Sequence, residues 1–216
     1  ATTTRPRRAS STLKTELVNH ERYTTRDEAR ASVFDYIEAF YNRRRIHDCG
    51  PDSIVTGRVA VRAPGGRITV GAGSWVAGYL VTETPQSRLV IGNNVFVGAR
   101  TTLDCAVSLT IEDDVLVSYG CVIADSDNHS IRASVRRQDL HGFRTGNYDW
   151  SNPDSKPIVV RRSAWIGAHS IILKGVTIGE GAIIGAGSVV TRSVADWSIN
   201  AGNPARQIRL LGEHER

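Results

Sequence analysis

The chain has 216 residues, a length that favours one domain with a short appendage. Hydrophobic residues make up 40% and aromatic residues 6%, which favours a narrow core of Ile, Val and Leu over a broad aromatic core. The formal net charge of +5 suits anionic partners such as nucleic acid, an acidic membrane surface or a phosphate-bearing cofactor, although much of the excess comes from arginines near the amino end.

Cysteine usage and hydropathy exclude several classes of protein. Cys49, Cys105 and Cys121 are widely spaced and form no C-x-x-C pair, which argues against a disulfide framework or a zinc site. No window reaches the apolar length of a membrane span, and the basic, polar start lacks the apolar region of a secretory signal. The sequence therefore favours a cytoplasmic protein, and it shows no metal-ligand spacing.

Residues 1–50 form a basic segment in which one helix is predicted. Thr25 stands three residues before Glu28, the pattern of a capping box. Apolar residues then recur on one helical face as far as Phe40, and Gly50 with the proline after it closes the segment. This helix is expected to cap the domain that follows, because a solenoid needs a cover for its terminal coil.

The sequence STLKTELVNHERYTTRDEARASVFDYIEAFYNRRRIH, residues 11–47, resembles the tail of the integrase domain of an insertion-sequence transposase. That family's catalytic glutamate would match a position near Arg7, and its other two acids have no counterpart upstream. The resemblance thus implies no transposase chemistry here. Either the segment is a residual DNA-binding piece or it is a cap. The cap is preferred, so nucleic acid is not the expected partner.

Residues 51–216 carry a hexapeptide rhythm. Its aliphatic residues are Val160, Ile166, Ile172, Ile178, Ile184 and Val190. Neither a helix nor an ordinary strand generates a period of six. Hexapeptide repeats are typical of parallel β-helices, whose short strands meet at glycine-tolerant corners. The pattern predicts an all-β domain in which the aliphatic residues fill the interior of a prism.

The rhythm is less regular earlier in the chain. Residues 55–81 predict one or two irregular coils. A series at spacing six begins at Ile91 and resumes at Ile111 after a shift of two residues, so a bulged corner is expected around residues 104–106. Residues 125–157 leave the rhythm altogether. A loop of this length inside a compact domain is usually functional or disordered, and its position favours function.

Residues 165–193, WIGAHSIILKGVTIGEGAIIGAGSVVTRS, and 201–209, AGNPARQIR, resemble the left-handed β-helix acyltransferases, most closely the sugar and polysaccharide O-acetyltransferases. The resemblance covers roughly the last three quarters of the chain. It implies a left-handed parallel β-helix with acetyl-coenzyme A as the acyl donor, and the chemistry expected of such an enzyme requires no metal. It also implies a homotrimer with active sites between neighbouring prisms, whose flat apolar sides suit closed symmetry. A basic tail is expected to end the chain.

His129 stands in IADSDNHSI, where a coil gives way to the long loop. Acyl transfer to a hydroxyl needs a base, and imidazole exchanges protons near neutral pH. The family's catalytic histidine occupies this place in the motif, so the resemblance implies that His129 is the general base. Asp125 and Asp127 are near enough in sequence to orient its ring, as the third member of a triad does. Turn formation is the alternative role for both.

The resemblance also implies a coenzyme A site on the later coils. The backbone N–H of Ala168 would stabilise the oxyanion, and Trp165 would either line the acyl pocket or cover a face of the β-helix. Arginines at the end of the chain match the family's phosphate contacts, since guanidinium groups bind phosphate through paired N–H donors. The candidate cofactor-binding residues are Trp165, Ala168, Gly185, Ala186, Thr191, Arg192, Arg206 and Arg209.

Acceptor recognition is assigned to the long loop. Sugar acetyltransferases of the galactoside and maltose type carry an asparagine and an aspartate before the histidine, and the matching positions here are about Ala99 and Val107. This departure shifts the prediction to the aromatic and arginine residues of the loop, which could stack on a sugar ring or grip a nucleotide-sugar diphosphate. The candidate substrate residues are Arg137, Tyr148 and Trp150.

The sequence therefore predicts an acetyl-coenzyme A-dependent O-acetyltransferase that moves an acetyl group directly to a saccharide hydroxyl in cell-surface polysaccharide synthesis. One alternative is N-acylation of an amino sugar on a nucleotide carrier, which the same histidine could serve. Another is a non-catalytic β-helix scaffold. The sequence does not identify the acceptor, the group that is acylated or the length of the acyl chain.

Overall fold

The computed structural model describes Thr25 and residues 46–216. The chain divides into two compact units, Ala1–Tyr41 and Asn42–Arg216. The helix predicted from Thr25 onward, and with it the amino-terminal cap, lies outside the described residues. The fold described is that of the second unit.

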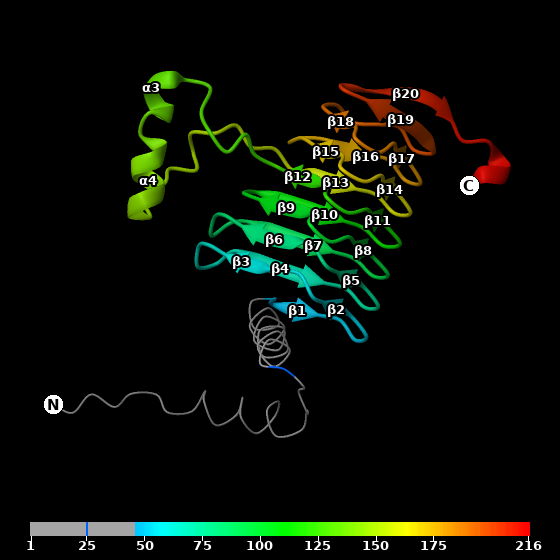
Figure 1. Ribbon diagram of the computed structural model, residues 1–216, viewed down its shortest axis with the longest axis horizontal. Helices are drawn as coiled ribbons and strands as arrows, with labels where there is room; N and C mark the ends of the chain where they lie inside the picture. Colours follow the sequence, from blue (N-terminus) through cyan, green and yellow to red (C-terminus); the bar gives the residue numbers. More distant parts are fainter. Residues whose placement is uncertain (1–24, 26–45) are drawn as a thin grey trace. The chain divides into compact units, whose positions relative to one another are not determined.

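The second unit is a parallel β-helix with three sheets as its faces (Figure 1). The first sheet contains β1 (Asp48–Cys49), β4 (Arg67–Val70), β7 (Arg88–Ile91), β10 (Ser108–Ile111), β13 (Ile158–Val160) and β16 (Thr177–Ile178). The second contains β2 (Ile54–Val55), β5 (Trp75–Val76), β8 (Phe96–Val97), β11 (Leu116–Val117), β14 (Trp165–Ile166), β17 (Ile183–Ile184), β19 (Ser198–Gly202) and β20 (Ala205–Leu210). The third contains β3 (Val59–Val61), β6 (Tyr79–Thr82), β9 (Thr102–Cys105), β12 (Val122–Ala124), β15 (Ile171–Ile172) and β18 (Val189–Val190). The predicted left-handed parallel β-helix is thereby confirmed.

The hexapeptide residues form the core as columns, one on each sheet. Val160 lies in register with Ile178, Ile166 with Ile184, and Ile172 with Val190. All six side chains are buried. One coil therefore takes three hexapeptides, and the period-six residue is the inward-facing one because each short strand places a single large side chain on the axis.

The shift of two residues between Ile91 and Ile111 is absorbed at one corner. Ile91 and Ile111 are still paired in register, so the extra residues lie between β9 and β10, as expected from the sequence. In the region for which irregular coils were expected, β3 and β6 pair in parallel over three residues, but Val59 pairs with Leu80, so a coil there is longer than the three hexapeptides of the later coils. The irregular spacing expected from the sequence is therefore present. The core of the second unit thus continues without a break from β3 to β18.

The end of the chain is more ordered than the expected basic tail. β19 continues the second sheet in parallel with β17, and β20 then turns back antiparallel to β19. A short 3₁₀ helix, η2 (Glu213–Glu215), follows. Among the helices that the structure describes, none is both long and apolar enough to cross a membrane.

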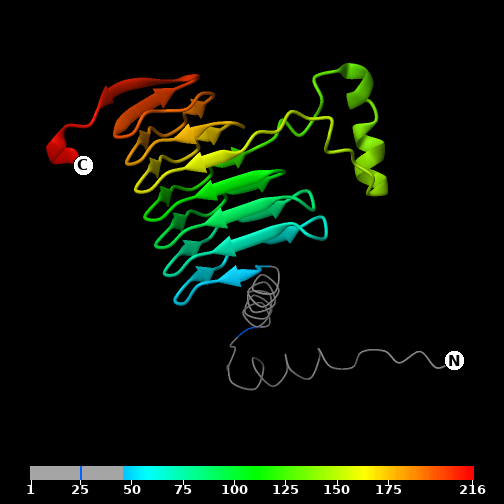
Figure 2. The ribbon, with the colours of Figure 1, turned by 180° about the vertical axis from the view of Figure 1, so that it is seen from behind.

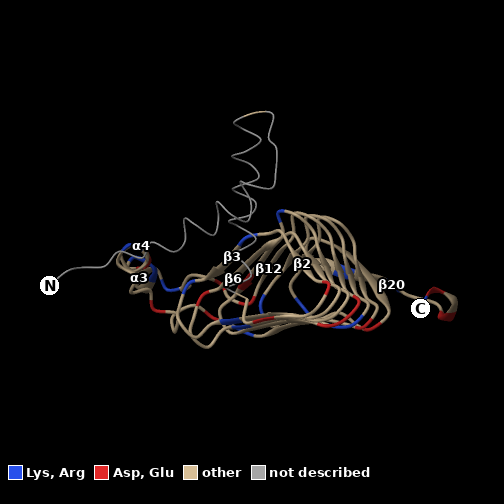
Figure 3. Cartoon of the chain, turned by 90° about the horizontal axis from the view of Figure 1, so that it is seen from below, with Lys and Arg blue, Asp and Glu red and all other residues tan. Residues whose placement is uncertain are grey.

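Residues 125–157 leave the coils as an arm that stands off the corner after β12 and returns at β13 (Figures 1 and 2). The arm contains two short helices, α3 (Ala133–Arg136) and α4 (Asp139–Thr145). Gly146 ends α4 in the left-handed conformation with φ 72°, which costs glycine little. Basic and acidic residues both occur on this arm (Figure 3), and its arginines include Arg136, Arg137 and Arg144.

Candidate active site

His129 lies at the base of the arm and is held by an aspartate of α4. Its Nδ1 atom is 2.7 Å from Oδ2 of Asp139. The imidazole is half exposed, whereas the Asp139 side chain is 9% exposed. Because a carboxylate accepts hydrogen bonds, this contact places the ring proton on Nδ1. Among the described residues, none forms a hydrogen bond with Nε2, which is therefore ready to accept a proton.

The two aspartates suggested by the sequence have other partners. Asp125 is fully buried, and its carboxylate accepts the backbone N–H groups of Ala106, Val107 and Ser108 at 2.6–2.8 Å. These N–H groups belong to the corner that absorbs the two extra residues. Asp125 therefore satisfies donors that the coil ladder leaves without a partner.

Asp127 helps to fix the arm to the coils. Its Oδ1 atom accepts a hydrogen bond from Nζ of Lys174 at 2.6 Å, and Lys174 also lies 3.5 Å from the carboxylate of Asp154. Asp127 and Asp154 belong to opposite stems of the arm, which pair through a bridge between Ser126 and Ser155. One lysine on the coils thus joins both stems, which positions His129 between them and α4.

Aromatic rings of the arm support the imidazole from the side. Phe143 meets the His129 ring edge to face at 5.9 Å and stacks on Tyr148 at 4.1 Å. Tyr148 also meets Trp150 edge to face at 4.9 Å, and its hydroxyl donates to the backbone carbonyl of Asn128. Burial raises the pKa of the Tyr148 hydroxyl, so it remains a donor. Tyr148 and Trp150 therefore pack the arm, which restricts the rotation of His129.

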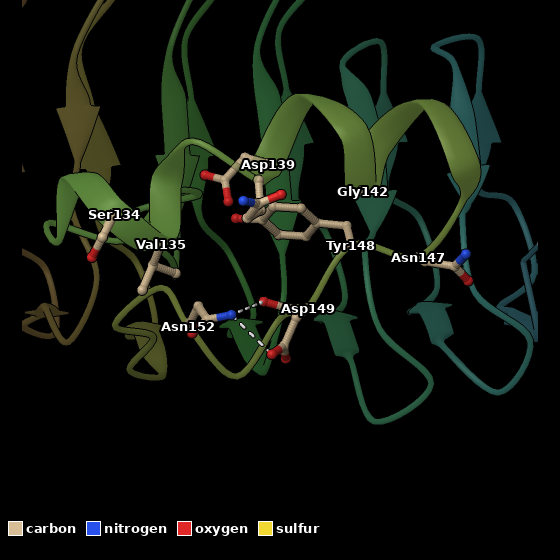
Figure 4. Close-up of a pocket in the computed structure, with 9 residues that line it drawn as sticks. Ser134, Val135, Asp139, Gly142, Asn147, Tyr148, Asp149 and Asn152 are labelled. Carbon is tan, nitrogen blue, oxygen red and sulfur yellow. Dashed lines mark hydrogen bonds between the residues drawn. The ribbon is translucent and has the colours of Figure 1, made fainter.

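A pocket of about 450 Å³ is lined by Asp139 and Gly142 of α4 and by Tyr148, which follows the helix (Figure 4). On its opposite wall, Asn152 donates to the backbone and the carboxylate of Asp149. His129 does not line this pocket. Arg137 lines a separate, open depression with His141 on the outer side of α4, so it is not brought to the imidazole.

His129 instead lines a pocket of about 240 Å³ between the arm and the third sheet. Trp150 and Phe143 form the arm side of this pocket. On the sheet side, the coils contribute Arg62, Glu83 and Asp104, none of which was suggested by the sequence reading. This is the cavity from which a small molecule would reach the imidazole.

The two acids of this pocket, Glu83 and Asp104, have pKa values above those of ordinary carboxyl groups. Nη1 of Arg62 lies 2.8 Å from Glu83, whose side chain is 4% exposed. Burial raises the pKa of Glu83 to about 7, with a further contribution from the charge of Asp104, and Arg62 offsets this only in part. Burial also raises the pKa of Asp104. The pair therefore holds a proton at pH values where isolated carboxyl groups are ionised.

The candidate donor residues lie on later coils. Trp165 is in β14 on the second sheet and about half exposed, and Ala168 follows the corner after it. Thr191, Arg192 and Arg206 are exposed. Gly185 accepts hydrogen bonds from two serine hydroxyls through its carbonyl, and Ala186 follows it. None of these residues lines the His129 pocket within one chain.

Arg209 differs from the other candidate arginines. Its Nη1 and Nη2 atoms both donate to the carboxylate of Glu215 at 2.6 Å. This bidentate pair occupies the donors that a phosphate would need. Within the part of the chain that the structure describes, no group of three or more His, Cys, Asp or Glu side chains is placed to hold a metal ion.

The sequence missed Asp139, Glu83 and Asp104 for a common reason. Asp139 follows His129 by ten residues, and only the fold of the arm brings them together. Glu83 and Asp104 lie on neighbouring coils, where Val81 pairs with Asp104 in register. The available signal was one acidic residue within β9 and another directly after β6, the strand paired with it, which the coil register could have aligned.

Family profiles match three parts of the chain. The profile described as bacterial transferase hexapeptide (six repeats) matches residues 157–192, and that of the hexapeptide repeat of succinyl-transferase matches residues 88–124. The integrase core domain profile matches residues 11–53. Both resemblances read from the sequence, to hexapeptide-repeat acyltransferases and to an integrase tail, are confirmed.

Relatives of known sequence cover part of the chain. Galactoside O-acetyltransferase of Escherichia coli (strain K12) is 30% identical over 154 residues, which are 68% of this chain and 66% of that protein. A relative from Staphylococcus aureus (strain COL) is 33% identical over 126 residues, 55% of this chain and 63% of the relative. The chain thus spans less than two thirds of the length of these relatives.

Solved structures share the fold. AntD, an N-acyltransferase from Bacillus cereus in complex with dTDP and 3-hydroxybutyryl-coenzyme A, has a TM-score of 0.62 at 22% identity, over 81% of this chain and 88% of that one. The polySia-specific acetyltransferase NeuO has a TM-score of 0.54 at 22% identity, over 76% and 78%. An acetyltransferase of Vibrio cholerae O1 biovar eltor, complexed with acetyl-coenzyme A, has a TM-score of 0.52 at 24% identity, over 94% and 86%. At these identities the likeness supports the fold alone.

Proposed function

We propose that this chain, whose coils carry the hexapeptide repeats of bacterial transferases, is an acetyl-coenzyme A-dependent O-acetyltransferase that acts on a saccharide hydroxyl. One observation carries the proposal: the His129 imidazole lines a pocket, and its Nδ1 atom is held by Oδ2 of Asp139 at 2.7 Å. The relationship to a galactoside O-acetyltransferase supports the same reaction class. A role in cell-surface polysaccharide synthesis belongs to this proposal.

The reaction is a direct transfer in which His129 acts as general base and then as general acid. Nε2 of His129 removes the hydroxyl proton of the acceptor as that oxygen attacks the thioester carbonyl carbon. Asp139 stabilises the imidazolium that results, as the third member of a triad does. When the carbon–sulfur bond breaks, Nε2 returns the proton to the thiolate of coenzyme A. No covalent intermediate with the protein forms, and the proton taken from the acceptor hydroxyl ends on the thiol of coenzyme A.

The donor is assigned to the later coils. The backbone N–H of Ala168 stabilises the oxyanion. At the corner after β17, the exposed Ala186 binds the amides of the pantetheine arm, because the N–H and carbonyl groups of Gly185 already have partners. Thr191 and Arg192 bind near the nucleotide, and Arg206 pairs with phosphate, since its guanidinium is exposed. Arg209 takes part only if the Glu215 carboxylate releases it.

A homotrimer forms part of the proposal. Trp165 lies on the second sheet, whereas the His129 pocket opens on the third. A site between two copies would combine the donor residues of one prism with the imidazole of its neighbour. Several large apolar side chains of the second sheet are about half exposed, which fits a covered face: Ile54, Trp75, Leu116 and Trp165.

The test measures the release of free thiol from acetyl-coenzyme A in the presence of sugars and nucleotide sugars, with mass spectrometry of the products. One sugar should gain an acetyl ester, and His129→Ala should lower kcat by about 10²–10⁴-fold. His214→Ala, an exposed histidine near the end of the chain, serves as the control and should leave turnover unchanged. Unchanged turnover in His129→Ala, or an amide product in place of an ester, would contradict the proposal. A light-scattering mass of one chain would contradict the trimer.

A further inference from the structure

The pocket beside His129 has a polar floor, formed by Glu83 and Asp104, that takes no part in the acyl-transfer chemistry. Glu83 follows β6 and Asp104 lies in β9, the adjacent strand of the third sheet. The backbone N–H of Glu83 donates to the carbonyl of Cys105, so ladder hydrogen bonds fix the two acids on neighbouring coils. Both side chains line the same cavity as the imidazole.

Two buried acceptor atoms of this pocket are poorly satisfied. Asp104 receives a hydrogen bond from Nδ2 of Asn128 at 3.4 Å through Oδ2, and its buried Oδ1 atom has no donor among the described residues except the proton that it shares with Glu83. Oδ1 of Asn128 is buried without a partner among the described residues. Buried polar atoms without partners are unfavourable. Asp104 and Asn128 line the pocket, so donors on a bound molecule can satisfy these oxygens.

The charges of the floor favour a neutral ligand over a cation. The guanidinium of Arg62 is 2.8 Å from Glu83 and compensates that carboxylate. An ammonium group bound here would face this guanidinium, whereas a hydroxyl group would not be repelled. The raised pKa values of Glu83 and Asp104 mean that the pair keeps a proton near neutral pH, so it can both donate to and accept from hydroxyl groups.

The walls of the pocket suit a sugar ring. Tyr79 of β6 and Trp150 of the arm both line the cavity with the two acids. Aromatic faces pack against the C–H groups of a pyranose, while carboxyl groups bind its hydroxyls. A cavity of about 240 Å³ has room for one sugar ring.

We propose that Glu83 and Asp104 form a subsite that binds two neighbouring hydroxyl groups of the acceptor sugar and so determines which further hydroxyl faces His129. This inference rests on the acyltransferase function proposed above. Arg62 positions Glu83, and Asn128, which directly precedes His129, couples Asp104 to the catalytic residue. The two acids are specificity-determining residues and take no part in proton transfer to the thioester.

The test uses direct binding, so that it does not depend on turnover. Methyl glycosides of galactose, glucose and mannose, their single-deoxy derivatives, and glucosamine as the amine probe are titrated by saturation-transfer NMR and calorimetry. At least one methyl glycoside should bind. Glu83→Gln and Asp104→Asn should each weaken it by about 10-fold, because the amide cannot hold the proton that the two acids share and one hydrogen bond to the sugar is lost. Asp114→Asn removes an exposed corner carboxylate outside the pocket and should change nothing.

The deoxy sugars provide a check that does not depend on how well the variants fold. A glycoside lacking one of the two bound hydroxyls should bind the unmodified protein about 10-fold more weakly and should lose no further affinity in Glu83→Gln. The proposal would be overturned if the unmodified protein and Glu83→Gln bound a glycoside equally well, or if Glu83→Gln weakened binding of the deoxy sugar as much as that of its parent. Tighter binding of glucosamine than of the methyl glycosides, or no binding of any glycoside, would overturn it as well. Affinity that depends on Glu83 without any acetyl transfer would support the subsite and overturn the acyltransferase.

Discussion

The coil and the arm each present a buried aspartate, and the two serve different ends. Asp125 directly follows β12 and accepts three backbone N–H groups from the corner between β9 and β10. Asp139, in α4 of the arm, accepts from one side chain, the imidazole of His129. The first carboxylate completes the hydrogen bonding of the β-helix, and the second orients a reactive group. The difference teaches that nearness in sequence to His129 does not identify its partner.

The largest expected effect on stability is at the coil aspartate. Asp125→Ala leaves three backbone donors unsatisfied, and each such group is unfavourable by about 1–3 kcal/mol. The free energy of unfolding should fall by about 3 kcal/mol or more in urea titrations. Asp127→Ala is the matched control, because it removes an ion pair near the surface and should cost less than about 1 kcal/mol. Equal losses in the two variants would contradict the role given to Asp125.

The arm aspartate should show the reverse pattern. Asp139→Asn keeps the shape of the side chain but lets an amide N–H face Nδ1, which favours the wrong tautomer of His129. We expect kcat to fall about 10²-fold with little change in KM for acetyl-coenzyme A. Nitrogen-15 NMR of the His129 ring should show that the proton has left Nδ1. An unchanged ring tautomer together with an unchanged kcat would remove Asp139 from the mechanism.

The smallest expected effect concerns the pH dependence of stability. The pKa of Glu83 is raised to about 7 in the folded state, above the ordinary value of about 4.5. The folded state therefore binds the extra proton between these values, so the free energy of unfolding should decrease as the pH rises from about 4.5 to about 7. Glu83→Gln should flatten this slope when stability is measured across that range. A slope as steep as that of the unmodified protein would show that the proton resides elsewhere.

The coils could be predicted from the sequence because one physical constraint repeats. Every sixth residue must fill the prism, so the spacing of Val160 and Ile178 alone predicts that they lie in the same column of the core. Even the corner near Asp104 could be predicted from the two-residue shift. The sequence also predicts His129, since the end of the rhythm and the family motif coincide there.

The arm could not be predicted in the same way, because it has no period. Its two short helices bury little: α3 has no buried residue and α4 buries only Asp139 and Gly142. Tertiary contacts with Phe143, Tyr148 and the stems determine where Asp139 lies. Glu83 could not be identified for the same reason, since only the fold brings it to the imidazole. Its environment depends on burial by neighbouring coils and on the arm above them, and neither can be read from local residue types.

The most direct test of the central claim, that Asp139 acts through His129, is the rate of acetyl transfer in a double-mutant cycle of these two residues. If Asp139 serves only to orient and stabilise the imidazole, the double variant His129→Ala, Asp139→Asn should be no slower than His129→Ala alone, within about 2-fold. A further loss of about 10²-fold in the double variant, equal to the loss from Asp139→Asn in the unmodified protein, would mean that the two residues act independently. That result would contradict the account.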